Sequence, residues 1–289
     1  MNFNVQVNDY LLAWYLLYGA SLSQELEKFK QKLYTKYKSE YNLCYKDKKE
    51  IVKYGKDFIP DNDLLYNIII ESPLFKSLKK ETQRYKIIIE ELWIKNENEL
   101  STYAKDVLKI IFPKDINVFI VHPRLQLKEY FRETNSLIFG DEKDKKDMLM
   151  SLMLIITKGV ISTKFTNDLS DEITNAVVEL SVLNEIGSKI CNKSCYNLGN
   201  NNYLPIKKQI YPYWLMYLGY TDDESLLKKI FKDNKDFKEN LAFDISKYTI
   251  DKNLKKLNIS QFLEYCIRNS NTIINTEGYE LIDDEVEVI

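Results

Sequence analysis

The chain has 289 residues, a length that suits one large domain or two smaller ones and allows a substantial apolar core. It carries 43 acidic and 41 basic side chains, so its formal net charge is −2. That balance argues against a dedicated nucleic-acid-binding protein, which usually shows a basic excess or a basic stripe.

The first part of the chain is expected to be helical throughout. Asn8 or Asp9 can cap an apolar, buried helix that begins near residue 10. Further helices are predicted, from apolar side chains at helical spacing, at residues 21–41, 64–71, 79–98 and 99–111. We therefore expect residues 1–112 to form a helical N-terminal region.

The character of the sequence changes at Pro113. The β-branched residues 116–121 lie between two prolines and predict a strand, and residues 136–139 predict a second, edge-like strand before a turn. An apolar helix is expected at residues 148–162.

An acidic helix is then expected at residues 171–190. A polar, Asn-rich loop at residues 191–202 and further helices from Tyr211 onward precede an acidic tail at residues 277–289. The predicted fold is therefore α+β and predominantly α-helical, with residues 113–289 as a second region.

Four cysteines are too few for a disulfide scaffold of this size. Cys191 and Cys195 are spaced CxxxC, and no second Cys or His pair completes a metal site. We expect reduced thiols, no metal and no other cofactor.

No predicted segment is suited to a membrane. The longest apolar run, residues 148–156, is shorter than the ~20 residues that span a bilayer. No basic segment precedes the apolar residues 11–18, so they do not resemble a secretory signal. The expectation is a soluble, cytoplasmic protein, and the heavy use of Asn, Lys, Ile and Tyr is typical of an AT-rich bacterial genome.

Candidate catalytic residues are few. His122 is the single histidine, and it follows a predicted strand without an HExxH, GxSxG or phosphate-loop motif around it. It is either a catalytic base or a strand-end residue bonded to the backbone. The aromatic cluster at residues 211–217, which includes Tyr213 and Trp214, is either core or the lining of a ligand groove.

The order of elements in residues 113–190 is a strand, an edge-like strand, an apolar helix and an acidic helix. This order resembles gluzincin-type zinc metallopeptidases. Under that resemblance the first zinc-binding histidine falls on Lys158, the catalytic glutamate on Gly159 and the second histidine on Ser162. The third ligand would be Glu179 or Glu185.

The resemblance implies a cleft without its metal. A protonated lysine has no lone pair for zinc, a glycine cannot act as a base and serine is a poor zinc ligand. The Lys158 ammonium is expected to replace the cation and pair with Glu179 or Glu185. The alternative is that Lys158 and Ser162 only end a core helix and that both glutamates are solvated.

Three functional hypotheses follow. The first is a non-catalytic, pseudo-metallopeptidase-like protein that binds a peptide or protein partner, and neither nucleic acid nor membrane. Its ligand would lie along the edge strand formed by Ser136, Leu137, Ile138 and Phe139, with side-chain pockets from Tyr213 and Trp214. The second is a metal-independent hydrolase or transferase that uses His122 or clustered carboxylates. The third is a helical interaction or assembly protein.

Overall fold

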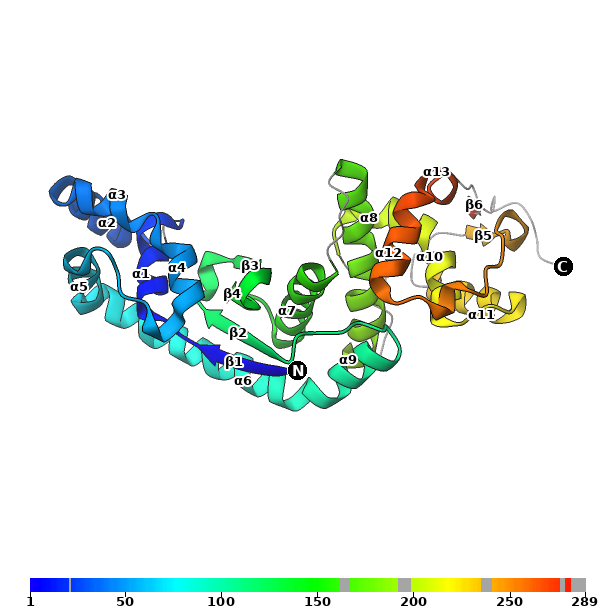
Figure 1. Cartoon of the computed structure of the whole chain (residues 1–289), viewed down its shortest axis with the longest axis horizontal. Coiled ribbons are helices and arrows are strands. Elements are labelled where there is room, and N and C mark those ends of the chain that lie inside the picture. The colour runs from blue at the N-terminus through cyan, green and yellow to red at the C-terminus, as the bar shows by residue number, and fades with distance from the viewer. Residues whose placement is uncertain (21, 162–166, 192–198, 235–240, 276–278, 282–289) are drawn as a thin grey trace. The chain divides into compact units, whose positions relative to one another are not determined.

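The structure is a computed structural model that describes every residue except 21, 162–166, 192–198, 235–240, 276–278 and 282–289 (Figure 1). The described chain is predominantly helical with a small four-stranded sheet, so the predicted α+β class is confirmed. It divides into two compact units. Unit 1 comprises Met1–Glu97 and Pro113–Ile156, and unit 2 comprises Asn98–Phe112 and Thr157–Ile289.

The sheet of unit 1 has the strand order β1-β2-β4-β3. Its strands are β1 (Asn2–Gln6), β2 (Asp115–Ile120), β3 (Leu127–Phe131) and β4 (Ser136–Gly140). β1 and β4 both pair with β2 in parallel, and β3 pairs with β4 antiparallel. Because β1 comes from the N-terminus, the first helices and the sheet belong to one unit, which differs from a division after residue 112.

The prediction that residues 136–139 form an edge strand is wrong. β4 is bonded to β2 on one side and to β3 on the other, and all of its residues are buried. Its backbone groups are already used, so no peptide can add to it by strand pairing. The sheet edges belong to β1 and β3, which the local pattern did not reveal.

Seven helices of the described residues contribute to unit 1, and the last two, α6 and α7, end in unit 2. Their bounds are α1 (Asp9–Tyr18), α2 (Gln24–Lys36), α3 (Lys38–Cys44), α4 (Asp47–Tyr54), α5 (Asp63–Glu71), α6 (Pro73–Asp106) and α7 (Lys145–Val160). The predicted cap of the first helix is present, because the Asn8 side chain accepts the N–H of Leu11 at 2.9 Å.

Helix α1 lies between two apolar clusters. Leu12, Leu16 and their neighbours pack with side chains of α2, α3 and α5. The other side of the helix, with Leu11 and Trp14, packs with α4 and with Phe119 and Ile138 of the sheet. The predicted burial of this helix is therefore confirmed.

Helix α6 is one continuous helix of 34 residues where the sequence suggested two. Two contacts fix it to the sheet. The ring of Trp93 stacks on Phe3 of β1 with centroids 3.7 Å apart. The Tyr85 hydroxyl donates to the carbonyl of Asp141 at 2.8 Å and accepts the N–H of the same residue at 3.1 Å.

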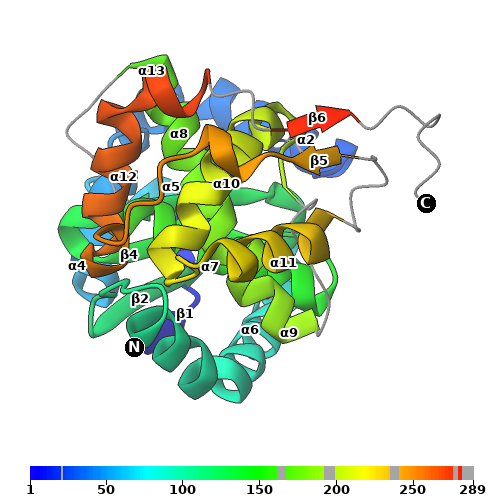
Figure 2. The ribbon, with the colours of Figure 1, turned by 90° about the vertical axis from the view of Figure 1, so that its right-hand side faces the viewer.

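Unit 2 is built around helices that lie side by side (Figure 2). Its elements are α8 (Asp168–Glu179), the π-helix η4 (Leu180–Gly187), α9 (Ser188–Cys191), α10 (Leu204–Leu218), α11 (Asp223–Asn234), α12 (Ile259–Arg268), α13 (Ser270–Ile273), β5 (Leu241–Phe243) and β6 (Tyr279–Leu281). Trp214 and Tyr217 of α10 pack on Phe262 of α12.

Short 3-10 helices connect these elements. They are η1 (Gly55–Asp57), η2 (Pro123–Leu125), η3 (Arg132–Thr134), η5 (Asn201–Tyr203), η7 (Ile245–Lys247) and η8 (Leu254–Lys256). Among the described residues, no helix combines the length and the apolar character that crossing a membrane requires.

Replacing Tyr85 by Phe tests the anchor between α6 and β4. The variant leaves the buried N–H and carbonyl of Asp141 without this hydroxyl, so we expect a loss of about 1–3 kcal/mol in the free energy of unfolding. Urea denaturation measures the loss. The control is Tyr45→Phe, because Tyr45 is 64% exposed. Equal stabilities of the two variants would contradict the anchor.

Buried phenols predict a loss of stability at alkaline pH. Burial raises the pKa of Tyr41 and of Tyr265 to about 12, whereas an unfolded tyrosine titrates near pH ~10. Above that pH the unfolded chain binds fewer protons than the native chain, so stability falls as pH rises from about 10 towards 12. Urea midpoints combined with phenolate absorbance check this. Unchanged midpoints across that window would contradict it.

Candidate functional site

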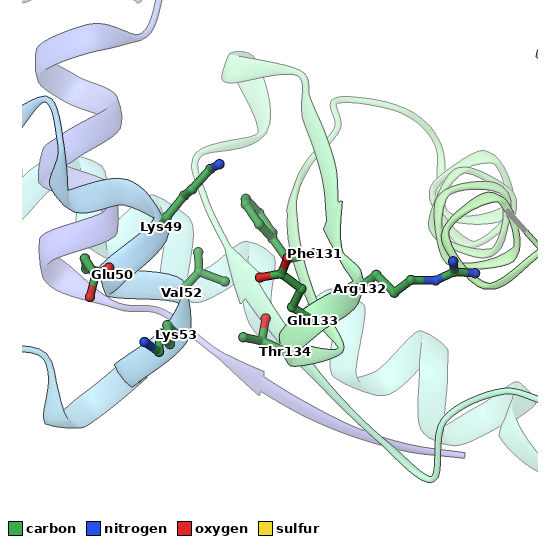
Figure 3. A pocket seen from close by; sticks show the side chains of 8 residues that line it. All are labelled: Lys49, Glu50, Val52, Lys53, Phe131, Arg132, Glu133 and Thr134. Atoms are coloured by element: carbon green, nitrogen blue, oxygen red, sulfur yellow. The ribbon is translucent and has the colours of Figure 1, made fainter. Parts of the chain in front are cut away.

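The main candidate site is a pocket of about 400 Å³ in unit 1 (Figure 3). It lies between helix α4 and the connection that follows β3. Its lining residues are Lys49, Glu50, Val52, Lys53, Phe131, Arg132, Glu133 and Thr134. The volume falls within the usual range of small-ligand sites, about 300–1,000 Å³.

Helix α4 supplies a charged rim over an apolar wall. Ile51 and Val52 are buried, whereas Lys49 and Lys53 are exposed. The two lysines are four residues apart, so they lie on the same face of the helix. Figure 3 shows both projecting from α4, with Phe131 on the opposite side and Arg132 directed away from α4.

The opposite wall is held by the turn between β3 and β4. Phe131 pairs with Ser136 at the end of the ladder. The turn closes at Asn135, which has the left-handed backbone angles φ 46° and ψ 46° that asparagine tolerates better than most residues. The carbonyl of Asn135 accepts the N–H of Asn117 at 3.0 Å, and this bond ties the turn to β2.

A half-buried cation supports the aromatic side of the pocket. The Lys48 ammonium lies 2.6 Å from Glu129 and within 6 Å of the ring centroids of Trp14, Tyr15 and Phe131. Burial, reinforced by the negative charge of Glu129, raises the pKa of Tyr15. Lys48 therefore lies against the Phe131 ring and already has a carboxylate partner in Glu129.

The neighbouring lysines differ from Lys48. Within the described part of the chain, neither Lys49 nor Lys53 has a carboxylate at ion-pair distance. The Lys53 ammonium lies 4.9 Å from the ring centroid of Tyr54, and its interaction with that phenol raises the pKa of Lys53. The rim of the pocket thus presents the ammonium groups of Lys49 and Lys53 to an external anion, beside the exposed carboxylates of Glu50 and Glu133.

His122 lies in a separate, small pocket of about 150 Å³ that Ser23 and Ser77 also line. Its Nε2 is 3.0 Å from Glu81, and its Nδ1 accepts the N–H of Arg124 at 3.3 Å. The bond to His122 lowers the pKa of Glu81. Both ring nitrogens are therefore occupied, and neither is aimed at a serine hydroxyl. This arrangement matches the strand-end role, with the backbone bond that the sequence suggested.

Glu179, one of the two candidate third ligands, is buried and paired with a lysine. Its carboxylate lies 3.2 Å from the Lys207 ammonium, and their side chains are 9% and 1% exposed. The N–H of Asn200 also donates to Glu179 at 2.9 Å. Gly199 lies against the same carboxylate with φ 121°, a position where a Cβ would collide with it.

Glu185 is held by neutral donors. It accepts the Tyr103 hydroxyl at 2.8 Å, the Asn184 amide at 2.9 Å and the Trp214 indole N–H at 3.2 Å. Both glutamates are buried, so the alternative in which they are solvated is wrong. The indole of Trp214 is fully buried and supports Glu185.

The cation that balances Glu179 is Lys207 of α10, whereas Lys158 is exposed. Ser162 lies outside the described residues. Burial lowers the pKa of Lys207, and the negative charge of Glu179 opposes that shift. The sequence pattern suggested an ammonium beside this helix, but it placed that ammonium on the wrong element.

The described residues contain no group of three His, Cys, Asp or Glu side chains that could hold a metal ion. Of the predicted aromatic residues, Tyr213 lines a pocket of unit 2. No sequence motif predicts the residues of the unit 1 pocket. The available signal was the interleaving of lysine and tyrosine along residues 28–56.

Comparisons with known proteins identify no relative. No family model matches the sequence, no curated protein matches it, and no solved structure matches the fold.

Replacing Lys207 by Met tests the buried pair. The variant leaves the Glu179 charge buried without its ammonium, so we expect a loss of about 3–5 kcal/mol in the free energy of unfolding. The double variant Glu179→Gln/Lys207→Met removes both charges and should recover much of that loss.

Lys158→Met is the matched control, because Lys158 is the lysine that the sequence favoured and it is exposed. Its expected effect on urea denaturation is within about 0.5 kcal/mol. If Lys158→Met destabilised the protein more than Lys207→Met, Lys207 would not be the lysine that balances Glu179.

Proposed function

We propose that this chain is a non-catalytic binding protein whose unit 1 receives an acidic segment of a peptide or protein partner. The pocket beside Lys49 and Lys53 is the anchor point. The observation that carries the proposal is the combination of an apolar wall, formed by Val52 and Phe131, with two exposed ammonium groups.

The charge around the pocket supports an acidic ligand. Residues 24–57, which form α2–α4 and η1, contain ten lysines and six carboxylates. One of those carboxylates, Asp47, is buried and accepts the Tyr66 hydroxyl at 3.0 Å, so it does not offset the surface charge. The exposed lysines of the segment are Lys28, Lys32, Lys36, Lys38, Lys46, Lys49, Lys53 and Lys56.

Aromatic side chains are interleaved with these lysines. Tyr34, Tyr45 and Tyr54 are 44%, 64% and 49% exposed. Tyrosine offers a large contact area at a low cost in conformational entropy, which is why binding surfaces use it. A surface that combines lysine and tyrosine therefore suits a ligand with both carboxylates and apolar groups.

A ligand of this kind can bind without joining the sheet. An apolar side chain would pack on Phe131 and Val52, while flanking carboxylates would contact Lys49 and Lys53. The central contact would supply most of the affinity, and the exposed lysines would supply attraction at long range. This mode replaces strand addition to residues 136–139, which the position of β4 prevents.

Descent from a gluzincin-type peptidase is a further part of the proposal. It is supported by the acidic helix α8, where an ammonium balances a buried carboxylate at the position expected to have held a metal ligand. Free, buried Cys44 and Cys266 are compatible with a reducing, cytoplasmic location.

The test uses a short dye-labelled peptide in which leucine is flanked by glutamates. We expect Lys49→Gln/Lys53→Gln to weaken its binding by roughly tenfold or more, measured by fluorescence anisotropy, because about 1.4 kcal/mol corresponds to tenfold. Affinity should also fall as salt screens the lysines. Phe131→Ala should weaken binding while leaving the salt dependence intact.

The matched control is Lys145→Gln/Lys146→Gln, which removes two exposed lysines at the start of α7. This variant should bind the peptide as the parent does. If the control variant weakened peptide binding as much as the pocket variant, the binding would be due to general charge attraction and not to the pocket. Tighter binding of single-stranded DNA than of the acidic peptide would replace the proposal with nucleic-acid binding.

A further inference from the structure

Unit 2 contains an aromatic pocket that the proposed function does not use. It has a volume of about 380 Å³ and lies among α10, the segment after η7, α12 and α13. Tyr213, Tyr265 and Asp251 line it together with Asn269, Ile250 and Ile273. We propose that this pocket binds a trimethylammonium group, either of a free small molecule or of a trimethylated lysine side chain.

Two rings form the aromatic part of the pocket. The centroids of Tyr213 and Tyr265 are 6.3 Å apart, and the ring planes are inclined by 50°. Two inclined rings form a corner, and a cation seated there lies within about 6 Å of both centroids, the range of a cation–π contact. The buried ring of Tyr248 packs edge-on against Tyr213 at 5.7 Å and holds that wall in place.

A carboxylate lies in the same pocket. Asp251 is half-buried, and its Oδ1 accepts the N–H of Asn253 at 2.8 Å, which fixes its orientation. In the described ranges, no lysine, arginine or histidine lies at ion-pair distance from Asp251. The pocket therefore offers a negative charge that the protein itself leaves unneutralised.

The remaining lining selects the kind of cation. Ile250 and Ile273 are apolar, Thr249 and Thr272 each bring a methyl group and a hydroxyl, and the Asn269 amide already donates to the carbonyl of Tyr265 at 2.9 Å. A primary ammonium is compact and strongly hydrated, so it would lose more hydration on entering this pocket than a trimethylammonium group would. A trimethylammonium group has no N–H to satisfy, so its methyl groups can contact both rings and the isoleucines while Asp251 balances its charge.

This inference is independent of the acidic ligand proposed for unit 1. The two sites lie in different units and attract opposite charges. Loss of one binding activity therefore leaves the other testable in the same preparation.

The experiment measures binding of choline to the full chain by calorimetry across the millimolar range. Choline should bind, whereas its neutral isostere 3,3-dimethylbutanol should bind at least about tenfold more weakly, since both have the same shape and only choline is charged. Absence of choline binding, or equal binding of the neutral isostere, would overturn the proposal.

Two variants locate the site. Tyr265→Ala removes one ring, and Asp251→Asn removes the charge while preserving the size of the side chain. Each should weaken choline binding by roughly tenfold. Tyr220→Ala is the matched control, because Tyr220 is 38% exposed in the same unit and does not line the pocket. Choline affinity unchanged by Asp251→Asn would contradict the assigned charge pairing even if Tyr265→Ala fails to fold.

A peptide that carries one trimethyl-lysine distinguishes the two sources of the group. Tighter binding of this peptide than of choline would identify a modified protein tail, and equal binding would identify a small molecule. The unmodified lysine peptide should bind more weakly than the trimethylated one, and the reverse order would overturn the selectivity argument.

Discussion

Helix α1 has no polar face, and this constraint organises unit 1. Residues 11–17 are all buried, so the helix must be covered on every side. Helices α2, α3 and α5 cover one side, and α4 and the sheet cover the other. The covering helices use their few apolar residues for this contact. Leu26 and Leu33 of α2 are buried, for example, whereas Lys28, Lys32 and Lys36 are exposed. The basic, tyrosine-rich surface follows from this division.

The packing of unit 2 depends on the ion-pair and hydrogen-bond partners of its buried carboxylates. Glu179 and Glu185 lie on one helical segment, and each requires partners that are distant in the sequence. The π-helix η4 holds Glu185 together with Asn184 in this segment, and a π-helix changes the angular spacing of its side chains relative to α8. Helix α10 then supplies both Lys207 and Trp214, seven residues apart and therefore on one face. Packing α8 against α10 therefore also brings the partners of these two carboxylates into place.

Local features were predictable from the sequence, and long-range pairings were not. The cap at Asn8, the burial of α1 and the strand at β2 follow from side-chain type and spacing. The five residues of β1 alternate between polar and apolar side chains, but this short pattern does not name a partner, and its parallel partner β2 lies more than a hundred residues away. The same limit explains why β4 was expected at an edge. It also explains why the sequence points to Lys158 and gives no sign of Lys207, since helical proximity can be inferred along one element but not between two elements.

Tyrosines have two different roles in this structure. A tyrosine whose hydroxyl is hydrogen-bonded in the interior stabilises the fold, whereas one without such a bond can stay exposed. The chain has 21 tyrosines. Tyr85, Tyr103 and Tyr217 use their hydroxyls to close bonds between distant elements. Such residues cannot become phenylalanine without leaving an interior polar group unpaired. Tyr45 and Tyr54 have no such obligation and remain largely exposed. The tyrosines that close interior hydrogen bonds are therefore different residues from those left exposed beside lysines in unit 1.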